Sequence, residues 1–158
     1  MKEKDLKEFL TRPEVNIEGK IIDGHIIDRY DNGNKKTEGN WKLGFRNGLI
    51  TEWFADGDKK QEGYYKDGQV NGLFTLWDKN GYKRTEQNYK NGKRDGLECK
   101  WYVNGQKYSE VYYKDEIKNG LWNVWYENGQ KKHQGIFKNG ELISLKISKL
   151  SAAFFPIW

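Results

Sequence analysis

The sequence predicts an all-β fold, an elongated array of 24-residue β-hairpin repeats that forms one continuous, twisted antiparallel sheet with a short N-terminal capping helix. Two glycine series carry this prediction. A first glycine recurs every 24 residues, at Gly24, Gly48, Gly72, Gly96 and Gly120. A second follows each of them nine residues later, at Gly33, Gly57, Gly81, Gly105 and Gly129. A fixed period of this kind is the signature of a repeat architecture in which each unit stacks on the next.

Other residue types also recur at fixed positions of the 24-residue unit, and the residues that share one such position are called a column. In the unit that begins at residue 48, the conserved types stand at Leu49, Trp53, Lys59, Glu62 and Tyr65, which are positions 1, 5, 11, 14 and 17 after the first glycine. The consensus reads G-L-x-x-x-W-Y-x-N-G-x-K-x-x-E-G-x-Y-K-x-G. Between the turns lie runs rich in Trp, Tyr, Phe, Thr and Ile, which are typical of β-strands. Each unit is therefore predicted to be one β-hairpin.

Two turn signals punctuate each unit. The first is an Asn-Gly or Asp-Gly pair at residues 32–33, 56–57, 80–81, 104–105 and 128–129. Because such pairs tolerate positive φ at both residues, they predict two-residue hairpin turns. The second signal leads into the next hairpin, at residues 67–68, 91–92 and 139–140. The glycines are accordingly interpreted as hinge points of hairpins.

Alternation with period two assigns the side chains to faces. On the first strand of a unit, the leucine, the residue at position three and the tryptophan share one face. On the second strand, positions thirteen, fifteen and seventeen share one face. The alternate positions of the second strand, exemplified by Lys60, Glu62 and Lys66, are expected on a solvated side where opposite charges support each other.

The glycine at position fifteen leaves space on its face. Gly39, Gly63 and Gly135 have no Cβ, so the tryptophan of an adjacent strand is predicted to lie across them. Gln87 and Val111 replace this glycine in two units, so the packing cannot be identical throughout.

Two different segments flank the repeats. Residues 1–13 are predicted to form a helical cap, because their apolar residues share one helical face before a proline. Residues 14–150 are the repeat domain, with a half unit at 14–23 and a partial unit at 144–150. Residues 151–158 form an apolar tail, which is expected to fold back on the last strand or to dock a partner.

The composition favours a single-layer sheet. Hydrophobic residues make up 35% of the chain and the mean hydropathy is −1.04, whereas aromatic residues make up 15%. Large rings can cover a narrow sheet with few aliphatic residues, and five units would extend over about 50 Å. No run approaches the roughly 20 apolar residues of a membrane span, and no signal-peptide stretch opens the chain. A cytoplasmic protein without a transmembrane segment is expected.

The charge gives little support to nucleic-acid binding. The net charge is +5 and the isoelectric point is about 9.1. A basic stripe with interleaved aromatic residues would suit a nucleic acid. The acid column at position 14 interrupts that stripe, so nucleic acid is not the expected partner.

No constellation for chemistry emerges from the sequence. His25 and His133 occupy different positions in distant units, so they cannot supply the converging ligands of a metal site. His25 is expected to be partly buried and His133 to lie at the surface. Cys99, the only cysteine, is expected to be a small buried side chain, because no histidine column accompanies it. The chain is predicted to be no enzyme, with no catalytic, cofactor-binding or metal-binding residues.

The consensus resembles the MORN-variant repeat family (membrane occupation and recognition nexus, second type). The resemblance rests on G-L-x-x-x-W-Y-x-N-G followed by E-G-x-Y-K-x-G, as in residues 48–68, and covers about residues 14–150. It implies a β-hairpin array without catalytic residues. Bacterial chains built only of such repeats resemble the YwqK-like antitoxin or immunity proteins, which act by binding a toxin. Eukaryotic MORN repeats are linked to membrane lipids and scaffolding.

The expected function is therefore that of a protein-binding repeat protein, most concretely an antitoxin or immunity protein. The alternatives are a lipid or membrane-surface adaptor and a structural scaffold that assembles through its sheet edges. Specificity is expected at aromatic residues of the variable positions two and sixteen and of the tail. The predicted partner-binding residues are Phe74, Trp122, Tyr64, Tyr112, Phe154, Phe155 and Trp158.

Overall fold

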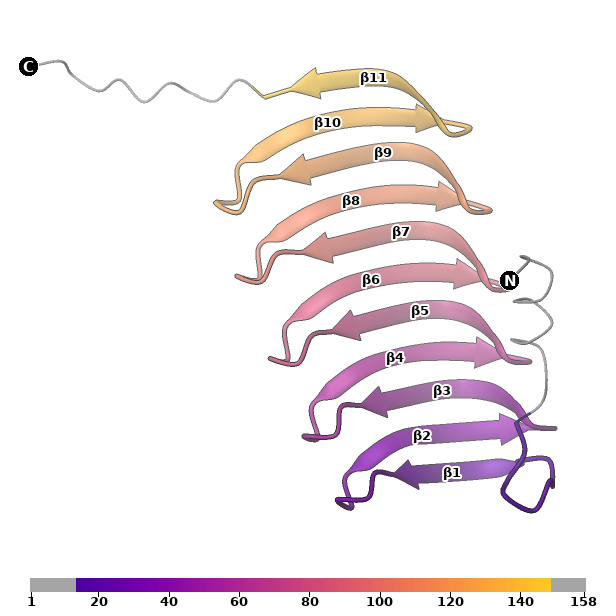
Figure 1. Ribbon diagram of the computed structural model, residues 1–158. Helices are drawn as coiled ribbons and strands as arrows, with labels where there is room; N and C mark the ends of the chain where they lie inside the picture. Colours follow the sequence, from indigo (N-terminus) through magenta and orange to yellow (C-terminus); the bar gives the residue numbers. More distant parts are fainter. Residues whose placement is uncertain (1–13, 149–158) are drawn as a thin grey trace, which may run out of the picture.

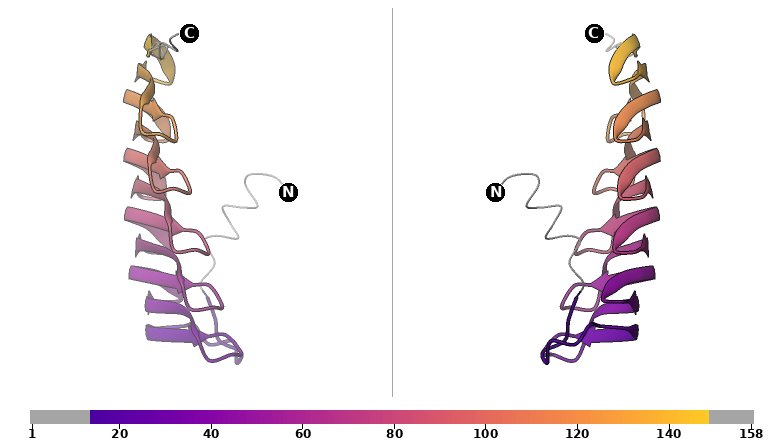
Figure 2. Two further views of the ribbon diagram at one scale, coloured as in Figure 1. Left: turned by 90° about the vertical axis from the view of Figure 1, so that its left-hand side faces the viewer. Right: turned by 90° about the vertical axis from the view of Figure 1, so that its right-hand side faces the viewer.

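A computed structural model describes residues 14–148 as one open antiparallel sheet of eleven strands, which follow each other in sequence order (Figure 1). Seen edge on, the strands form a single layer (Figure 2). The all-β array is confirmed, and residues 14–148 contain no helix. The predicted helical cap at 1–13 and the tail at 151–158 lie outside this range. The strands are β1 Gly24–Arg29, β2 Lys35–Lys42, β3 Phe45–Trp53, β4 Lys59–Lys66, β5 Gln69–Trp77, β6 Lys83–Lys90, β7 Lys93–Trp101, β8 Lys107–Lys114, β9 Ile117–Trp125, β10 Lys131–Lys138 and β11 Glu141–Ile147.

The Asn-Gly turns differ from the predicted two-residue form. In the loop between β3 and β4, only Gly57 has positive φ, and its N–H donates to the Phe54 carbonyl at 3.0 Å. The Asp56 carboxylate accepts the N–H of Asp58 at 3.2 Å. The polar residue before the glycine is therefore favoured here for its side-chain hydrogen bond to the backbone and not for tolerance of positive φ.

The two-residue turns follow the even-numbered strands instead. Asp67 and Gly68 have φ of 49° and 80°, as a type I′ hairpin turn requires. Two further turns of this kind, at residues 43–44 and 115–116, lack the Asn-Gly or Asp-Gly signature. The second of them ends in Glu116 at φ 73°.

From the unit at residue 48 onward, the first glycine lies inside a strand and is not a hairpin hinge, which corrects the sequence interpretation; Gly24 is the first residue of β1. In the β4–β5 pair, Gly63 lies opposite Phe74, but the next pair joins Tyr65 to Val70. Two extra residues of β5 are accommodated at this bulge, where Gly72 adopts φ 129°. Positive φ at a bulge is the conformation that glycine adopts without a steric penalty. The 24-residue ladder thus marks a regular bulge in strands β3, β5, β7 and β9.

The pairing register divides the side chains between two faces. One face, here called the tyrosine face, carries the aromatic column Trp41, Tyr65, Tyr89, Tyr113 and Phe137. The opposite face, here called the tryptophan face, carries the column Trp53, Trp77, Trp101 and Trp125 together with the acid column. The predicted grouping of the leucine, position three and the tryptophan on one face of the first strand is confirmed.

The central row of the tyrosine face is the most crowded part of the sheet. Ile50 packs over Gly39, Phe74 packs over Gly63, and the Trp122 ring lies 3.1 Å from the position that a Cβ of Gly135 would occupy. The space above these glycines is therefore filled by the residue at position two. The sequence predicted that the tryptophan at position five fills this space. That prediction is wrong, because the tryptophan side chain lies on the other face.

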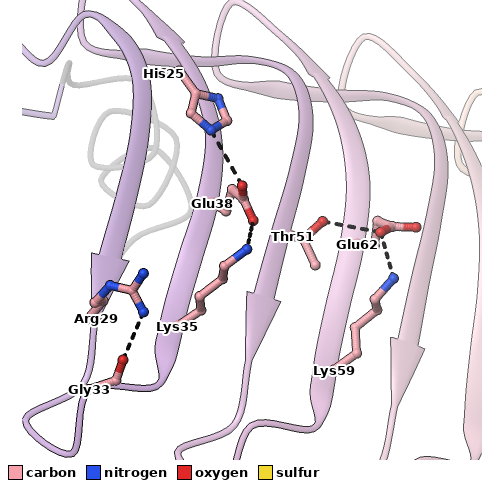
Figure 3. Close-up of polar contacts among 8 residues, drawn as sticks. All are labelled: His25, Arg29, Gly33, Lys35, Glu38, Thr51, Lys59 and Glu62. Atoms are coloured by element: carbon pink, nitrogen blue, oxygen red, sulfur yellow. Dashed lines mark hydrogen bonds and ion pairs between the residues drawn. The ribbon is translucent and has the colours of Figure 1, made fainter.

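On the tryptophan face a charged motif repeats along the array (Figure 3). The Lys35 ammonium donates to Glu38 at 2.6 Å and lies 5.3 Å from the ring centroid of Trp53 on the next strand. The same pattern recurs at Lys59, Lys83 and Lys107. This hydrogen bond lowers the pKa of Glu38, and the motif supplies the mutual support between opposite charges that the sequence suggests. Lys60 departs from that expectation, since a bulge turns it to the tyrosine face beside Glu52.

The array changes at its two ends. Before β1, Val15 pairs with Ile21 in an isolated bridge, so residues 14–23 form no strand of the sheet. Glu14 would fall in the acid column by the repeat period. Instead it lies on the tyrosine face, where it accepts the indole N–H of Trp41 at 2.7 Å. At the other end, Ser144 stands where the ladder glycine would be.

The absent glycine alters the register of β11. The bulge in β11 holds one extra residue where the earlier bulges hold two, so Gly135 lies opposite Leu145. A shift of one residue moves every side chain to the other face. Leu145 therefore lies on the tyrosine face, although its equivalent in the preceding unit, Leu121, lies on the tryptophan face.

The packing over Gly63 generates a stability prediction. A Cβ added at Gly63 would overlap the Phe74 ring, so Gly63→Ala should lower the free energy of unfolding by about 1–3 kcal/mol. In a Phe74→Ala background the same change should cost almost nothing, because the ring is absent. Urea denaturation of the four proteins in this double-mutant cycle measures the difference. An equal cost of Gly63→Ala in both backgrounds would contradict the packing.

Candidate partner-binding surface

The predicted partner-binding residues lie on both faces of the sheet. Tyr64 and Tyr112 lie on the tryptophan face, where 51% and 43% of their surface is exposed. Phe74 and Trp122 are half-buried on the tyrosine face. Phe154, Phe155 and Trp158 lie outside the residues that the structure describes. A single partner surface can include only the first pair or the second.

Phe74 and Trp122 pack against neighbours of their own face. Phe74 makes an edge-on contact with Tyr89, with ring centroids 6.0 Å apart. Trp122 contacts Phe137 at 5.6 Å and stacks against the ring of His133 at 6.3 Å. Because of these contacts and the glycines beneath them, both rings contribute to the packing of the sheet itself.

Tyr64 and Tyr112 belong to a longer row of exposed apolar side chains. Leu49 pairs directly with Tyr64, and Leu121 pairs directly with Ile136. At the bulges, Tyr64 lies over Gly72 and Tyr112 lies over Gly120, so the row continues from one hairpin to the next. We call this row the apolar stripe. Its exposed members are Leu49, Tyr64, Leu73, Tyr112, Leu121 and Ile136.

The apolar stripe crosses strands β3 to β10, which at about 4.8 Å per strand gives a length of roughly 34 Å. Asn88 and Leu97 fill its middle, and the Asn88 amide donates to the Leu97 carbonyl at 3.1 Å. Monomeric soluble proteins seldom expose a long contiguous apolar patch unless it contacts another molecule. Tyr64 and Tyr112 are recognisable from the sequence as aromatic residues at a variable position. The stripe itself is not, because a regularly repeated leucine gives no sign from its spacing that it is exposed.

A row of exposed lysines runs beside the apolar stripe on the same face. Each lysine is the last residue of an even-numbered strand, and on β4, β6, β8 and β10 it stands two residues after the residue that lies in the stripe. Lys114 is the member with an ion pair, to Asp95 at 2.8 Å, and this contact raises its pKa and lowers that of Asp95. We call this set the lysine row. It consists of Lys42, Lys66, Lys90, Lys114 and Lys138.

The tyrosine face holds a groove of about 480 Å³ near its N-terminal end. Charged groups line it, and they are largely paired with each other: Arg46 bonds Glu52 at 2.7 Å, and Lys36 bonds Asp28 at 3.1 Å. Burial is the largest single influence and disfavours the charge of Arg46, but Glu52, Tyr65 and Glu14 together outweigh it, so the guanidinium pKa is raised. The groove therefore offers few free polar groups to a ligand.

The residues considered for chemistry lie apart. His25 is exposed, in contrast to the expectation, and its ring lies 3.4 Å from the Glu38 carboxylate (Figure 3). The other ring nitrogen lies 3.3 Å from the Asn40 side-chain oxygen. His133 is half-buried against Trp122, and so is less exposed than expected. Cys99 is buried as predicted, and burial raises the pKa of its thiol. Residues 14–148 contain no cluster of three His, Cys, Asp or Glu side chains suited to a metal ion.

The repeat geometry agrees with a known family. The model of the MORN repeat variant matches the chain at residues 46–67, 94–115 and 118–139. Each match starts near the beginning of an odd-numbered strand and ends in the turn after the next even-numbered strand. Three hairpins of this protein are therefore similar to MORN-variant repeats, as the consensus indicates. A search of curated proteins found no significant match. Within residues 14–148 no helix is long and apolar enough to cross a membrane.

Proposed function

We propose that this chain is a non-catalytic repeat protein that binds another protein through the tryptophan face of its sheet. The observation that supports this most strongly is the apolar stripe. Its six exposed side chains lie in one row across β3 to β10, and nothing within residues 14–148 covers them. Tyrosine side chains offer a large contact area at a small entropic cost, and so are favoured as anchors in interfaces.

The lysine row indicates the charge of the partner. Its ammonium groups flank the stripe, so a partner that presents apolar residues beside acidic ones would complement both features. In its most specific form the proposal is a cytoplasmic antitoxin or immunity protein that neutralises a toxin by direct binding. This form is supported by the resemblance to YwqK-like chains and by a docking surface that needs no catalytic group.

Tyr64 and Tyr112 provide the first test. The wild-type chain and a Tyr64→Ser/Tyr112→Ser variant are used as baits in the native lysate, with quantitative mass spectrometry of the captured proteins. We expect the variant to lose the partner, because it loses both anchors of the stripe. Tyr82→Ser is a matched control, since Tyr82 is also 51% exposed but lies in a turn outside the stripe. Equal capture by all three baits would refute the assignment of the stripe.

For the antitoxin form, the captured protein is expressed with and without this chain. The proposal requires that its toxicity be suppressed by the wild-type chain and not by the double tyrosine variant. A captured protein that is harmless when expressed alone would remove the antitoxin form and leave the protein-binding proposal intact.

The lysine row provides a test with changes in opposite directions. Lys66→Gln removes one charge and should slow association with the captured partner, most clearly at low salt. Asp95→Asn should speed association, because it releases Lys114 from its ion pair. Asparagine already occupies the equivalent position in three other units, at Asn47, Asn71 and Asn119, so the fold should tolerate it. Association rates that respond to neither change, measured by surface plasmon resonance, would exclude an acidic partner surface.

A lipid or membrane-surface adaptor is the second candidate function, and the lysine row is the observation that favours it. Basic side chains at this density are attracted to anionic lipids, with about 1 kcal/mol gained for each lysine near the surface. Sedimentation with vesicles that contain anionic lipids would reveal this function at low salt. Failure of the protein to pellet with them would exclude it.

A further inference from the structure

Within residues 14–148, no strand pairs with the outer edge of the last strand, β11. β11 pairs with β10 on one side only, and all seven of its residues are exposed. Four of its side chains are large and aliphatic, namely Leu142, Ile143, Leu145 and Ile147. Natural sheets usually protect an edge strand with charge, proline or a cover, because open edges pair with other strands. β11 carries little such protection within residues 14–148.

Backbone geometry shows which groups of β11 are free. The N–H of Ser148 donates to the Lys132 carbonyl at 3.0 Å, in the same register that pairs Ile147 with His133. In an antiparallel ladder, alternate residues direct their backbone groups to opposite neighbours. Ser144 and Lys146 therefore bond β10, whereas Leu145 and Ile147 direct their N–H and C=O groups to the open edge.

The odd number of strands restricts what can extend the sheet. Because all neighbours are antiparallel and there are eleven strands, β1 and β11 run in the same direction. A head-to-tail copy would therefore place β1 beside β11 as a parallel strand. A copy rotated by 180° about the sheet normal places its own β11 there, antiparallel and with the faces matched. That arrangement is a closed twofold dimer.

We propose that β11 is the interface of a homodimer in which the β11 strands of two copies pair about a twofold axis at Leu145. This register joins the free backbone groups of Leu145 to those of the partner's Leu145. It also places Ile143 opposite Ile147 of the second copy, so that only aliphatic pairs meet on the tyrosine face. On the tryptophan face Ser144 meets Lys146.

A neighbouring register is less favourable. Moving the axis to Lys146 would place the two Lys146 side chains directly opposite each other, and like charges in that position are destabilising. The opposite edge is also less suited, since the short strand β1 carries Asp28 and Arg29 at its end. The interface along β11 is small, so the dimer should be weak and its population should depend on concentration.

Sedimentation velocity of the full chain over a wide concentration range tests the proposal. We expect a reversible monomer–dimer equilibrium for the wild type and a monomer for Leu145→Lys, which brings two ammonium groups together at the axis. Ile27→Lys is the matched control on β1, where Ile27 is 42% exposed against 48% for Leu145. It should dimerise like the wild type. Circular dichroism verifies that both variants fold.

Cross-linking then tests the register. In a Cys99→Ser background, Leu145→Cys should form a disulfide-linked dimer on mild oxidation, because residues in a hydrogen-bonded antiparallel pair have Cα atoms about 5.5 Å apart. Lys146→Cys should cross-link poorly, since the two positions are offset. A wild-type monomer at every concentration, a dimer that survives Leu145→Lys, or efficient cross-linking through Lys146→Cys alone would each overturn the proposal.

Discussion

The register of the strands is the constraint on which the rest of this structure depends. A single-layer sheet has no second layer to cover its side chains, so each residue is buried only by neighbours on its own face. Ile50 and Gln87 retain just 2% and 1% of their exposed surface in this way. Such burial requires that the residue at position two lie directly opposite the residue at position fifteen, whether the latter is a glycine as at Gly63 or a larger residue as at Gln87. The recurrent bulge at the ladder glycine keeps these two positions opposite each other in hairpin after hairpin.

Ser144 shows what happens when the constraint is relaxed. Without the glycine, the bulge of β11 is one residue shorter and Leu145 changes face relative to Leu121. The regular repeat ends at that strand, and a set of aliphatic side chains is left at the open edge. The same backbone feature thus accounts for the regularity of the array and for the distinct character of its last strand.

The sequence predicted the elements of this fold better than their details. Period and turn residues gave the hairpins and the order of the strands, because each unit is stabilised by local pairing. The two-residue turns were predicted at the Asn-Gly and Asp-Gly pairs, but they lie after the even-numbered strands. The reason is that Asp56 is favoured for a side-chain hydrogen bond that spacing alone does not reveal. Bulges move residues such as Lys60 to the other face, so simple alternation assigned it wrongly.

Only part of the candidate surface could be predicted from the sequence, because the sequence does not show which regular positions stay exposed. Tyr64 and Tyr112 stood out because they vary between units, and the structure places both on the tryptophan face. The leucines beside them are regular, and regular leucines in a repeat are normally read as core. In a single-layer sheet that inference fails, because Leu49 and Leu121 have no opposing layer and stay exposed. The regularly repeated residues therefore form both the scaffold of the sheet and part of its exposed apolar surface.

Nuclear Overhauser contacts to the position-fifteen glycines test the division into two faces most directly. The account predicts contacts from the Phe74 ring to the Hα atoms of Gly63 and from the Trp122 ring to those of Gly135. The Trp77 indole, on the opposite face, should give none to Gly63. Contacts from Trp77 to Gly63, without those from Phe74, would contradict the register and with it the exposure of the apolar stripe.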